Sequence, residues 1–181
     1  MTRSRGLGDV YKRQVLIPEK NQLWISNGRK SWCESRDGTY LKTNLSQNKR
    51  RIDDMTIVTS KNHSNQTLKK VIEKLNFKDQ IVMGSVGCKI ASILRGESNI
   101  YICLSLPGKS SPKDWDFAAP EAILKTAGGS LTNLNNDELS YGGSNFEQGG
   151  IIVATSGKIS HKSICSQIMQ VIRKFDLYPF D

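Results

Sequence analysis

The sequence predicts a layered α/β protein, and two features of its pattern support this fold class. Short runs rich in Val and Ile alternate with segments whose apolar residues recur every three or four positions. Alternating strands and helices build a largely covered sheet with helices on its faces. A chain of 181 residues is long enough for one solid core, or for one domain with a piece of another. We therefore expect an α-β-α sandwich preceded by a short β segment.

The first 55 residues differ from the rest in composition. Residues 1–14 are rich in Arg and Gly and have no usable apolar period, so we interpret them as a foreign or misassembled extension. From Val15 to Ile25, two apolar strands flank a Pro-Glu-Lys-Asn-Gln turn, which predicts a hairpin. Residues 27–54 are polar and predict a loop with short strands, ending at the solvated pair Asp53-Asp54. The expected domains are 15–55, the end of a first α+β domain, and 56–181, an α/β domain.

The second part of the chain predicts six strands and four helices. The strands are expected at 55–59, 80–84, 100–104, 131–134, 138–141 and 150–154. The first helix carries Leu68 and Val71 and is expected to be capped by Ser64 or Asn62. The second ends at Gly96, because glycine suits the left-handed position after a helix. The third spans 115–127, and the last carries Ile164, Ile168, Val171 and Ile172.

Composition and charge restrict the class of partner and the compartment. The net charge of +9 suits a polyanionic partner, but residues 1–14 alone contribute +3 of it. No Arg-rich tract or alternation of aromatic and basic residues indicates nucleic-acid binding. No apolar run approaches the ~20 residues that span a bilayer, and no secretory signal is recognisable, so we expect a cytoplasmic protein with no membrane partner. The four cysteines form no C-x-x-C pair, which favours reduced thiols over a zinc site.

The segment W-D-F-A-A-P-E-A-I-L-K-T-A-G-G, from Trp115 to Gly129, places the carboxylate of Asp116 at a helix start. Unpaired N–H groups and the positive end of the helix dipole stabilise a phosphate there. A carboxylate beside that phosphate can hold a divalent cation. The alternative is a helix cap, which stabilises by about 1 kcal/mol without any catalytic role. Asp114, two residues earlier, is interpreted as a loop or cap residue.

Two further segments indicate phosphate or nucleotide contacts. In Gly84-Ser85-Val86-Gly87-Cys88-Lys89, a glycine-containing turn exposes N–H groups, and Lys89 adds a positive charge. The spacing is not that of a P-loop, and the alternative for Lys89 is a solvated helix face. In Thr59-Ser60-Lys61-Asn62-His63-Ser64-Asn65, His63 and Ser64 are candidate ligand contacts, although a loop with a helix cap explains this segment equally well.

The W-D-x-A-A segment with its downstream A-G-G resembles the Mg²⁺-dependent inositol monophosphatase superfamily. The A-P-E-x-I-L run and the closing strand at 149–155 are similar to its 3'(2'),5'-bisphosphate nucleotidase branch. The resemblance implies the C-terminal domain of that fold, with the last strands of the first domain. It also implies that Asp116 binds a catalytic Mg²⁺, that Ser85 and Lys89 contact substrate phosphate, and that His63 and Ser64 lie against the nucleotide. The implied reaction removes the 3'-phosphate of adenosine 3',5'-bisphosphate.

The sequence departs from this family in its metal motifs. The family uses a metal-binding Glu and a D-P-[IL]-D-G-T segment, and neither is found here. Asp37-Gly38-Thr39 echoes the end of that segment, but Ser35-Arg36 precede it, so we expect only a turn. One carboxylate cannot hold several Mg²⁺ ions, so the chain is expected to be close to inactive, as the C-terminal part of a longer phosphatase.

Three alternative functions stay open. An inositol monophosphatase would act on inositol phosphate. A non-catalytic domain would bind nucleotide or phosphate without Mg²⁺. A nucleic-acid-binding protein is suggested by the net charge alone.

Overall fold

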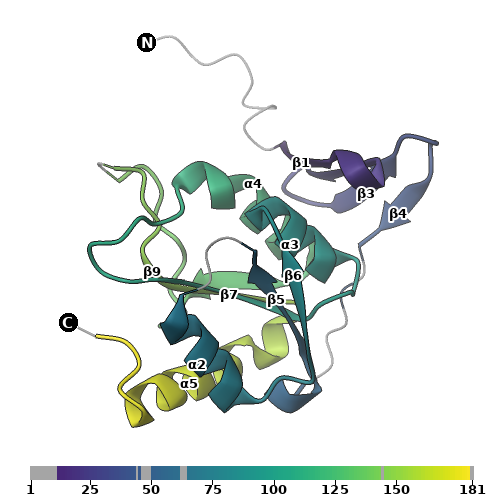
Figure 1. The fold of residues 1–181 in the computed structure, drawn as a ribbon. Helices are drawn as coiled ribbons and strands as arrows, with labels where there is room; N and C mark the ends of the chain where they lie inside the picture. Colours follow the sequence, from purple (N-terminus) through teal and green to yellow (C-terminus); the bar gives the residue numbers. More distant parts are fainter. Residues whose placement is uncertain (1–11, 44, 46–49, 62–64, 144, 180–181) are drawn as a thin grey trace.

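The computed structural model describes residues 12–179 except 44, 46–49, 62–64 and 144, and their strands form two sheets (Figure 1). The first sheet contains β1 (Arg13–Ile17), β2 (Gln22–Ser26), β3 (Ser31–Ser35) and β4 (Tyr40–Lys42). The second contains β5 (Thr56–Ser60), β6 (Asp79–Met83), β7 (Ile100–Ser105), β8 (Ser130–Asn133) and β9 (Gly150–Thr155). The α-helices are α2 (Gln66–Leu75), α3 (Val86–Leu94), α4 (Asp114–Ala127) and α5 (Lys158–Lys174). Single 3₁₀ turns span Pro18–Lys20 and Ile52–Asp54.

The first sheet is an antiparallel meander that begins with the predicted hairpin. β1 pairs with β2 from Arg13 opposite Ser26 to Ile17 opposite Gln22. Asn21 adopts the left-handed conformation in the turn between them, with φ of 51°. Asparagine tolerates this conformation better than most residues, so the turn fits its sequence.

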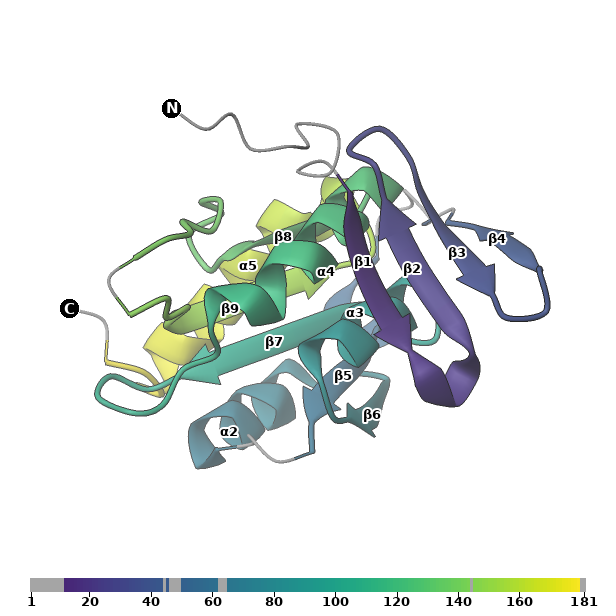
Figure 2. The ribbon, with the colours of Figure 1, turned by 90° about the horizontal axis from the view of Figure 1, so that it is seen from above.

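The second sheet has the strand order β6-β5-β7-β9-β8, and its first three strands are parallel. β9 runs antiparallel to both of its neighbours. α2 and α5 pack together on one face of this sheet, and α3 and α4 pack together on the other (Figures 1 and 2). This arrangement confirms the α-β-α sandwich that the alternating pattern predicted.

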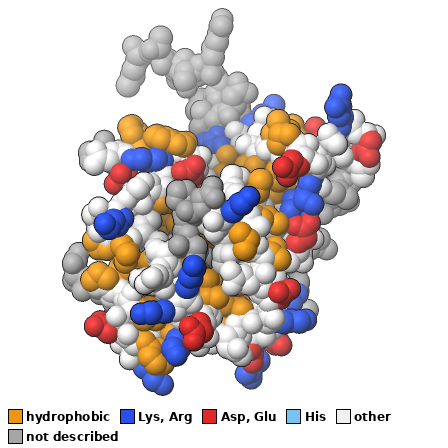
Figure 3. Space-filling model, in the orientation of Figure 1, with side chains coloured by type: hydrophobic (Ala, Val, Ile, Leu, Met, Phe, Trp, Pro, Cys, Tyr) orange, Lys and Arg blue, Asp and Glu red, His pale blue; other side chains and the backbone are white. Residues whose placement is uncertain are grey.

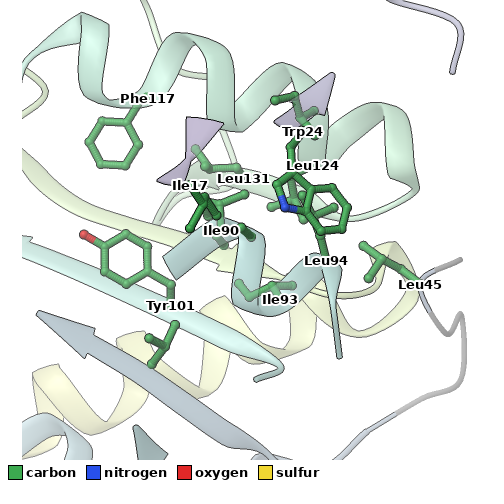
Figure 4. Packing of buried hydrophobic residues seen from close by; sticks show 14 of the residues in the cluster. Ile17, Trp24, Leu45, Ile90, Ile93, Leu94, Tyr101, Phe117, Leu124 and Leu131 are labelled. Carbon is green, nitrogen blue, oxygen red and sulfur yellow. The ribbon is translucent and has the colours of Figure 1, made fainter. Parts of the chain in front are cut away.

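The first sheet adds a further layer, because it packs against α3 and α4. Ile17 and Trp24 of the first sheet share one hydrophobic cluster with Ile90 of α3 and Leu124 of α4 (Figure 4). Cys33 of β3 belongs to the same cluster. A second cluster fills the opposite face of the large sheet, beneath α2 and α5, and includes Ile57, Val71, Ile100, Val153 and Ile168. Since the first sheet buries apolar side chains against α3 and α4, the two parts share a core. A domain boundary near residue 55 stays a prediction.

Two of the expected elements are wrong. The cap of α2 is Asn65, not Ser64 or Asn62, since its side-chain oxygen accepts the N–H of Leu68 at 2.7 Å. The same side chain donates to the carbonyl of Leu104 at 3.0 Å, so β7 also holds it in place. Residues 138–141 do not form a strand, because Tyr141 instead donates its hydroxyl proton to Glu121 of α4.

Candidate active site at the carboxyl ends of the parallel strands

Three helices of the described chain begin at one edge of the large sheet. Asn65, Ser85 and Lys113 precede the first turns of α2, α3 and α4, and each follows one of the parallel strands β5, β6 and β7. The carboxyl ends of parallel strands lie at the same edge of a sheet. β6 pairs with one side of β5 and β7 with the other, so the strand order reverses at β5. Ligands of open α/β sheets bind at such a reversal of strand order, where helix N–H groups are exposed.

Asp116 lies in the first turn of α4 and caps that helix. One of its carboxylate oxygens accepts the N–H of Lys113 at 2.8 Å, and its own N–H donates to the Lys113 carbonyl at 2.9 Å. This reciprocal pair satisfies an N–H that would otherwise be unpaired. The interpretation of Asp116 as a helix-capping residue is therefore confirmed. The side chain is only half-buried, and its charge acts on Lys89 of α3 and on Tyr101 and Cys103 of β7. A metal-binding role for Asp116 stays a prediction.

Lys89 is buried at the start of α3, with only 2% of its surface exposed. Its ammonium donates to the carbonyl of Gly84 at 2.7 Å and lies 5.1 Å from the centroid of the Tyr101 ring, a cation–π distance. Burial is the largest factor and lowers the pKa of Lys89, while the Asp116 carboxylate acts in the opposite direction. The alternative of a solvated surface lysine is wrong. The ammonium is instead a fixed charge at the turn where α3 begins.

Ser85 is the N-cap of α3, and its hydroxyl oxygen accepts the N–H of Cys88 at 3.1 Å. The side chain is exposed, so capping leaves it accessible to a ligand. The other two expected contacts, His63 and Ser64, lie outside the described residues. The structure therefore places Ser85 and Lys89 at the start of α3 and Asp116 at the start of α4, the helix that packs against α3.

Two residues of β7 near Lys89, Tyr101 and Cys103, were not predicted from the sequence. They lie two positions apart on β7, so their side chains share one face of the sheet. Burial is the main factor that raises the pKa of both the Tyr101 phenol and the Cys103 thiol, which keeps both groups neutral near Asp116. Only the strand alternation of residues 100–104 could have placed them on this face, since neither belongs to a recognisable motif.

A segment that we call the strap, residues 140–148 without the undescribed Ser144, is fastened to the start of α4. Asp114 is buried, and its two carboxylate oxygens accept the N–H of Gly142 and the side-chain N–H of Gln148, both at 2.6 Å. The Asp114 N–H donates to the carbonyl of Phe146 at 2.8 Å. Sequence analysis treated Asp114 as a loop or cap residue, because no local pattern links it to Gln148. The strap holds in place the turn that carries Asp116.

A cavity of about 540 Å³ opens beside this site, at the carboxyl end of β7. Ser105 and the loop that follows it line one side, and Glu147 of the strap and the start of β9 line the other. Tyr178, from the end of the chain, donates its hydroxyl to the Ser105 carbonyl at 3.0 Å. Lys113 forms an ion pair with Glu147 at 2.8 Å, so the α4 turn and the cavity wall are connected.

The donor set does not by itself fit the metal centre that the family resemblance implies. Mg²⁺ prefers six oxygen ligands, and Asp116 supplies one carboxylate. Within the described part of the chain, no three His, Cys, Asp or Glu side chains gather where they could hold an ion. Asp37 accepts the N–H of Thr39 at 2.9 Å, and Gly38 has a φ of 82°. The exposed Asp37-Gly38-Thr39 segment is therefore the expected turn.

The surface of the molecule shows its charges dispersed on the face that Figure 3 displays, where Lys and Arg lie among Asp and Glu. The positive charge is thus not gathered into one patch on that face. Among residues 12–179 outside the gaps, no helix has the length and apolar character needed to cross a membrane.

Two curated relatives match part of the chain. The mouse 3'(2'),5'-bisphosphate nucleotidase 1 is 36% identical over 85 residues, which cover 47% of this chain and 26% of the mouse protein. The mouse Golgi-resident adenosine 3',5'-bisphosphate 3'-phosphatase is 25% identical over 145 residues, covering 76% of this chain and 38% of the relative. The chain therefore spans well under half the length of these relatives.

The fold matches solved structures as well. The crystal structure of CysQ from Bacteroides thetaiotaomicron, a bacterial member of the inositol monophosphatase family, superposes with a TM-score of 0.62 at 20% identity. The superposition covers 80% of this chain and 58% of that chain, which confirms the predicted fold. The model of the inositol monophosphatase family matches residues 14–173. The chain belongs to the inositol monophosphatase family.

Proposed function

We propose that this chain forms part of a Mg²⁺-dependent phosphomonoesterase that removes the 3'-phosphate of adenosine 3',5'-bisphosphate. One arrangement carries the proposal: the Asp116 carboxylate lies at the start of α4, and the buried ammonium of Lys89 is held at the start of α3, the helix that packs against α4. Family membership supports a phosphatase, and the names of the two mouse relatives support the nucleotide substrate. The cytoplasmic compartment stays a prediction, because one of these relatives is named as Golgi-resident.

The described residues can bind and orient a phosphate group. The starts of α3 and α4 present the positive ends of their helix dipoles to a phosphate, and Lys89 adds a positive charge at the same edge. Asp116 can offer its carboxylate to a cation that also touches the phosphate. Since the other ligands that Mg²⁺ requires are not among the described residues, hydrolysis needs carboxylates from elsewhere.

Binding to the 181-residue chain tests the phosphate contact. Calorimetric titration with adenosine 3',5'-bisphosphate should show binding that Lys89→Met weakens by about tenfold, the usual loss for a charge-assisted hydrogen bond. Methionine keeps the apolar stem of the buried side chain, so the fold should survive. Lys70→Met on the exposed face of α2 is the matched control and should bind like the unmodified chain. Equal affinity of the Lys89→Met chain would remove Lys89 from the site.

Turnover tests the reaction and the substrate. The protein encoded by the full reading frame that contains Val15–Asp181 should release phosphate from adenosine 3',5'-bisphosphate in the presence of Mg²⁺, and Asp116→Asn should abolish most of this release. A clear preference for inositol 1-phosphate would replace the nucleotidase by an inositol monophosphatase.

A second function is favoured by the incomplete donor set around Asp116 among the described residues. A non-catalytic domain would bind the same nucleotide equally well with and without Mg²⁺, and the protein encoded by the full reading frame would release no phosphate. Phosphate release that depends on Mg²⁺ would exclude this second function.

A further inference from the structure

A second and larger hollow, of about 1000 Å³, lies at the end of α2 that is remote from the candidate active site. Three parts of the chain line it: residues 50–53 before β5, the last residue of α2 with Asn76, and the first turns of α5, where Ser160, Lys162, Ser163, Ser166 and Gln167 face it. The ten residues of α2 begin beside the candidate site and end here, which separates the two places by about 15 Å. The hollow is therefore distinct from the site around Asp116.

The charge around this hollow is positive. Arg50, Arg51 and Lys162 line it, with Asp53 as the acidic lining residue. Arg51 already holds Asp53 through two hydrogen bonds of 3.0 and 2.9 Å, so these two charges cancel. Arg50 and Lys162 are exposed, and neither takes part in an ion pair with another described residue. Two cations are thus available to a ligand.

The wall formed by α5 adds hydrogen-bond donors. Ser160 is buried with 8% of its surface exposed, and its oxygen accepts the backbone N–H of Arg50 at 3.0 Å, which joins the 50–53 segment to α5. No described acceptor receives the hydroxyl proton of Ser160, so this proton can be donated into the hollow. The first turn of α5 contains no acidic residue, so the positive end of its dipole is not neutralised there. The end of α2 that reaches the hollow is the negative end of its helix dipole, and Lys74 lies in that last turn.

The lining also contains apolar groups, since Ile52 is buried at 4% exposure and Leu75 is half-buried. An inorganic anion would use only the cations and the hydroxyls. A ligand with an anionic group and a flat apolar body would use both kinds of surface, and the volume is sufficient for a molecule of drug size. Nucleoside monophosphates combine these two features.

We propose that this hollow is a second binding site for a nucleoside monophosphate. Its phosphate lies between Arg50 and Lys162 and accepts the hydroxyl proton of Ser160, while its base lies against Ile52 and Leu75. The proposal is independent of the proposed function, because it uses none of the residues around Asp116 and Lys89.

Backbone amide NMR of the ¹⁵N-labelled chain tests this site with adenosine 5'-monophosphate as the probe. The amides of Arg51–Asp53 and Ser160–Gln167 should shift on titration, and Arg50→Glu or Lys162→Glu should weaken this binding by about tenfold or more. Both side chains are exposed, and the Arg50 contact to Ser160 uses the backbone, so the fold should be retained. Lys70→Glu, a matched charge reversal on the exposed face of α2, should leave the binding unchanged.

Three outcomes would overturn the second site. The first is a set of shifts confined to Ser85–Lys89 and Asp116, which would report the candidate active site alone. The second is binding that survives both charge reversals. The third is an affinity for inorganic phosphate equal to that for the nucleotide, which would show that Ile52 and Leu75 do not bind the base. Failure of the proposed function leaves this test unaffected, because Asp116→Asn should not change the shifts of Ser160–Gln167.

Discussion

His161 is a buried imidazole outside the candidate active site. It lies on α5 with 4% of its surface exposed, and its two ring nitrogens lie 2.8 Å from the hydroxyl oxygens of Thr155 and Thr132. A neutral imidazole has one N–H donor and one acceptor, so the ring donates to one of these hydroxyl oxygens and its other nitrogen accepts from the second hydroxyl or from the Cys165 thiol, 3.7 Å from Nε2. Burial lowers the pKa of His161 from the ordinary value of 6.5 to about 4. The ring therefore joins β8 and β9 to α5 in its neutral form.

The fold should lose stability in mild acid because of this residue. The unfolded chain protonates His161 below pH 6.5, but the folded chain resists until about pH 4. The contribution of neutral His161 to the free energy of unfolding is thus fully present above pH 6.5. It is lost as the pH falls toward 4, and the total loss is on the order of 3 kcal/mol. Urea unfolding at several pH values should show this loss in the unmodified chain and a smaller one in His161→Gln. Parallel pH profiles for the two chains would contradict the prediction.

Gly129, in the A-G-G motif, is required for close packing after α4. A β-carbon at this position would lie 2.6 Å from a methyl carbon of Leu124 and 2.8 Å from the carbonyl oxygen of Thr155. Neither the buried leucine nor the strand backbone can move aside without cost, so Gly129→Ala should destabilise the fold by about 1–3 kcal/mol. Gly143→Ala, where nothing lies within 4 Å of the added carbon, should change the stability by less than about 0.5 kcal/mol. Equal urea midpoints for the two variants would refute this explanation of the motif.

The sequence predicted the residues of the candidate site where a local pattern marked them. Asp116 and Lys89 each lie at a helix start that turn residues and apolar spacing indicate. The burial of Lys89 and its contact with Tyr101 were not predictable, because they depend on how α3 packs against β7. Asp114 was not predictable for the same reason, since its partner Gln148 is 34 residues away in the chain.

The strap is held by side chains of α4 and by backbone hydrogen bonds to Pro112 and Asp114, rather than by the large sheet. Asp114 holds it at Gly142 and Gln148, and Glu121, which also pairs with Lys125 at 2.7 Å, receives the hydroxyl of Tyr141. This anchoring explains why residues 138–141 are not a strand although their sequence alternates.

Helices and central strands were predicted within a few residues because their apolar period is long and regular. A four-residue alternation carries little information against such tertiary contacts.

Asp114→Asn should release the strap. Both carboxylate oxygens accept N–H groups, so an amide nitrogen in place of one oxygen would face a donor and leave a buried group unsatisfied. We expect a loss of about 1–3 kcal/mol and faster amide hydrogen exchange across residues 140–148. Glu138→Gln removes only an exposed ion pair with Lys125 and should leave the exchange unchanged. Unaltered exchange in Asp114→Asn would show that Tyr141 and Lys113 hold the strap without it.

In the molecule as a whole, each sheet has an edge strand that carries an exposed apolar side chain. The described chain places β2 on one side of β1 and no strand on the other. Leu16 of β1 is 64% exposed, and Val82 of β6, the edge strand of the large sheet, is 57% exposed. An unpaired edge with apolar side chains is a template for pairing with another chain.

The chain should therefore self-associate through β1. Light scattering over a range of concentrations should show growing particles for the unmodified chain, because a free edge strand pairs with its copies at micromolar to millimolar concentrations. Leu16→Lys should reduce this growth, since a lysine on an edge strand opposes pairing through its charge, and the side chain is already exposed. Val82→Lys makes the same change on the edge of the other sheet and should have a weaker effect, because β6 begins with the polar Asp79 and Gln80. If Val82→Lys alone prevents association, the contact is at β6, and a stable monomer of the unmodified chain would show that neither edge pairs.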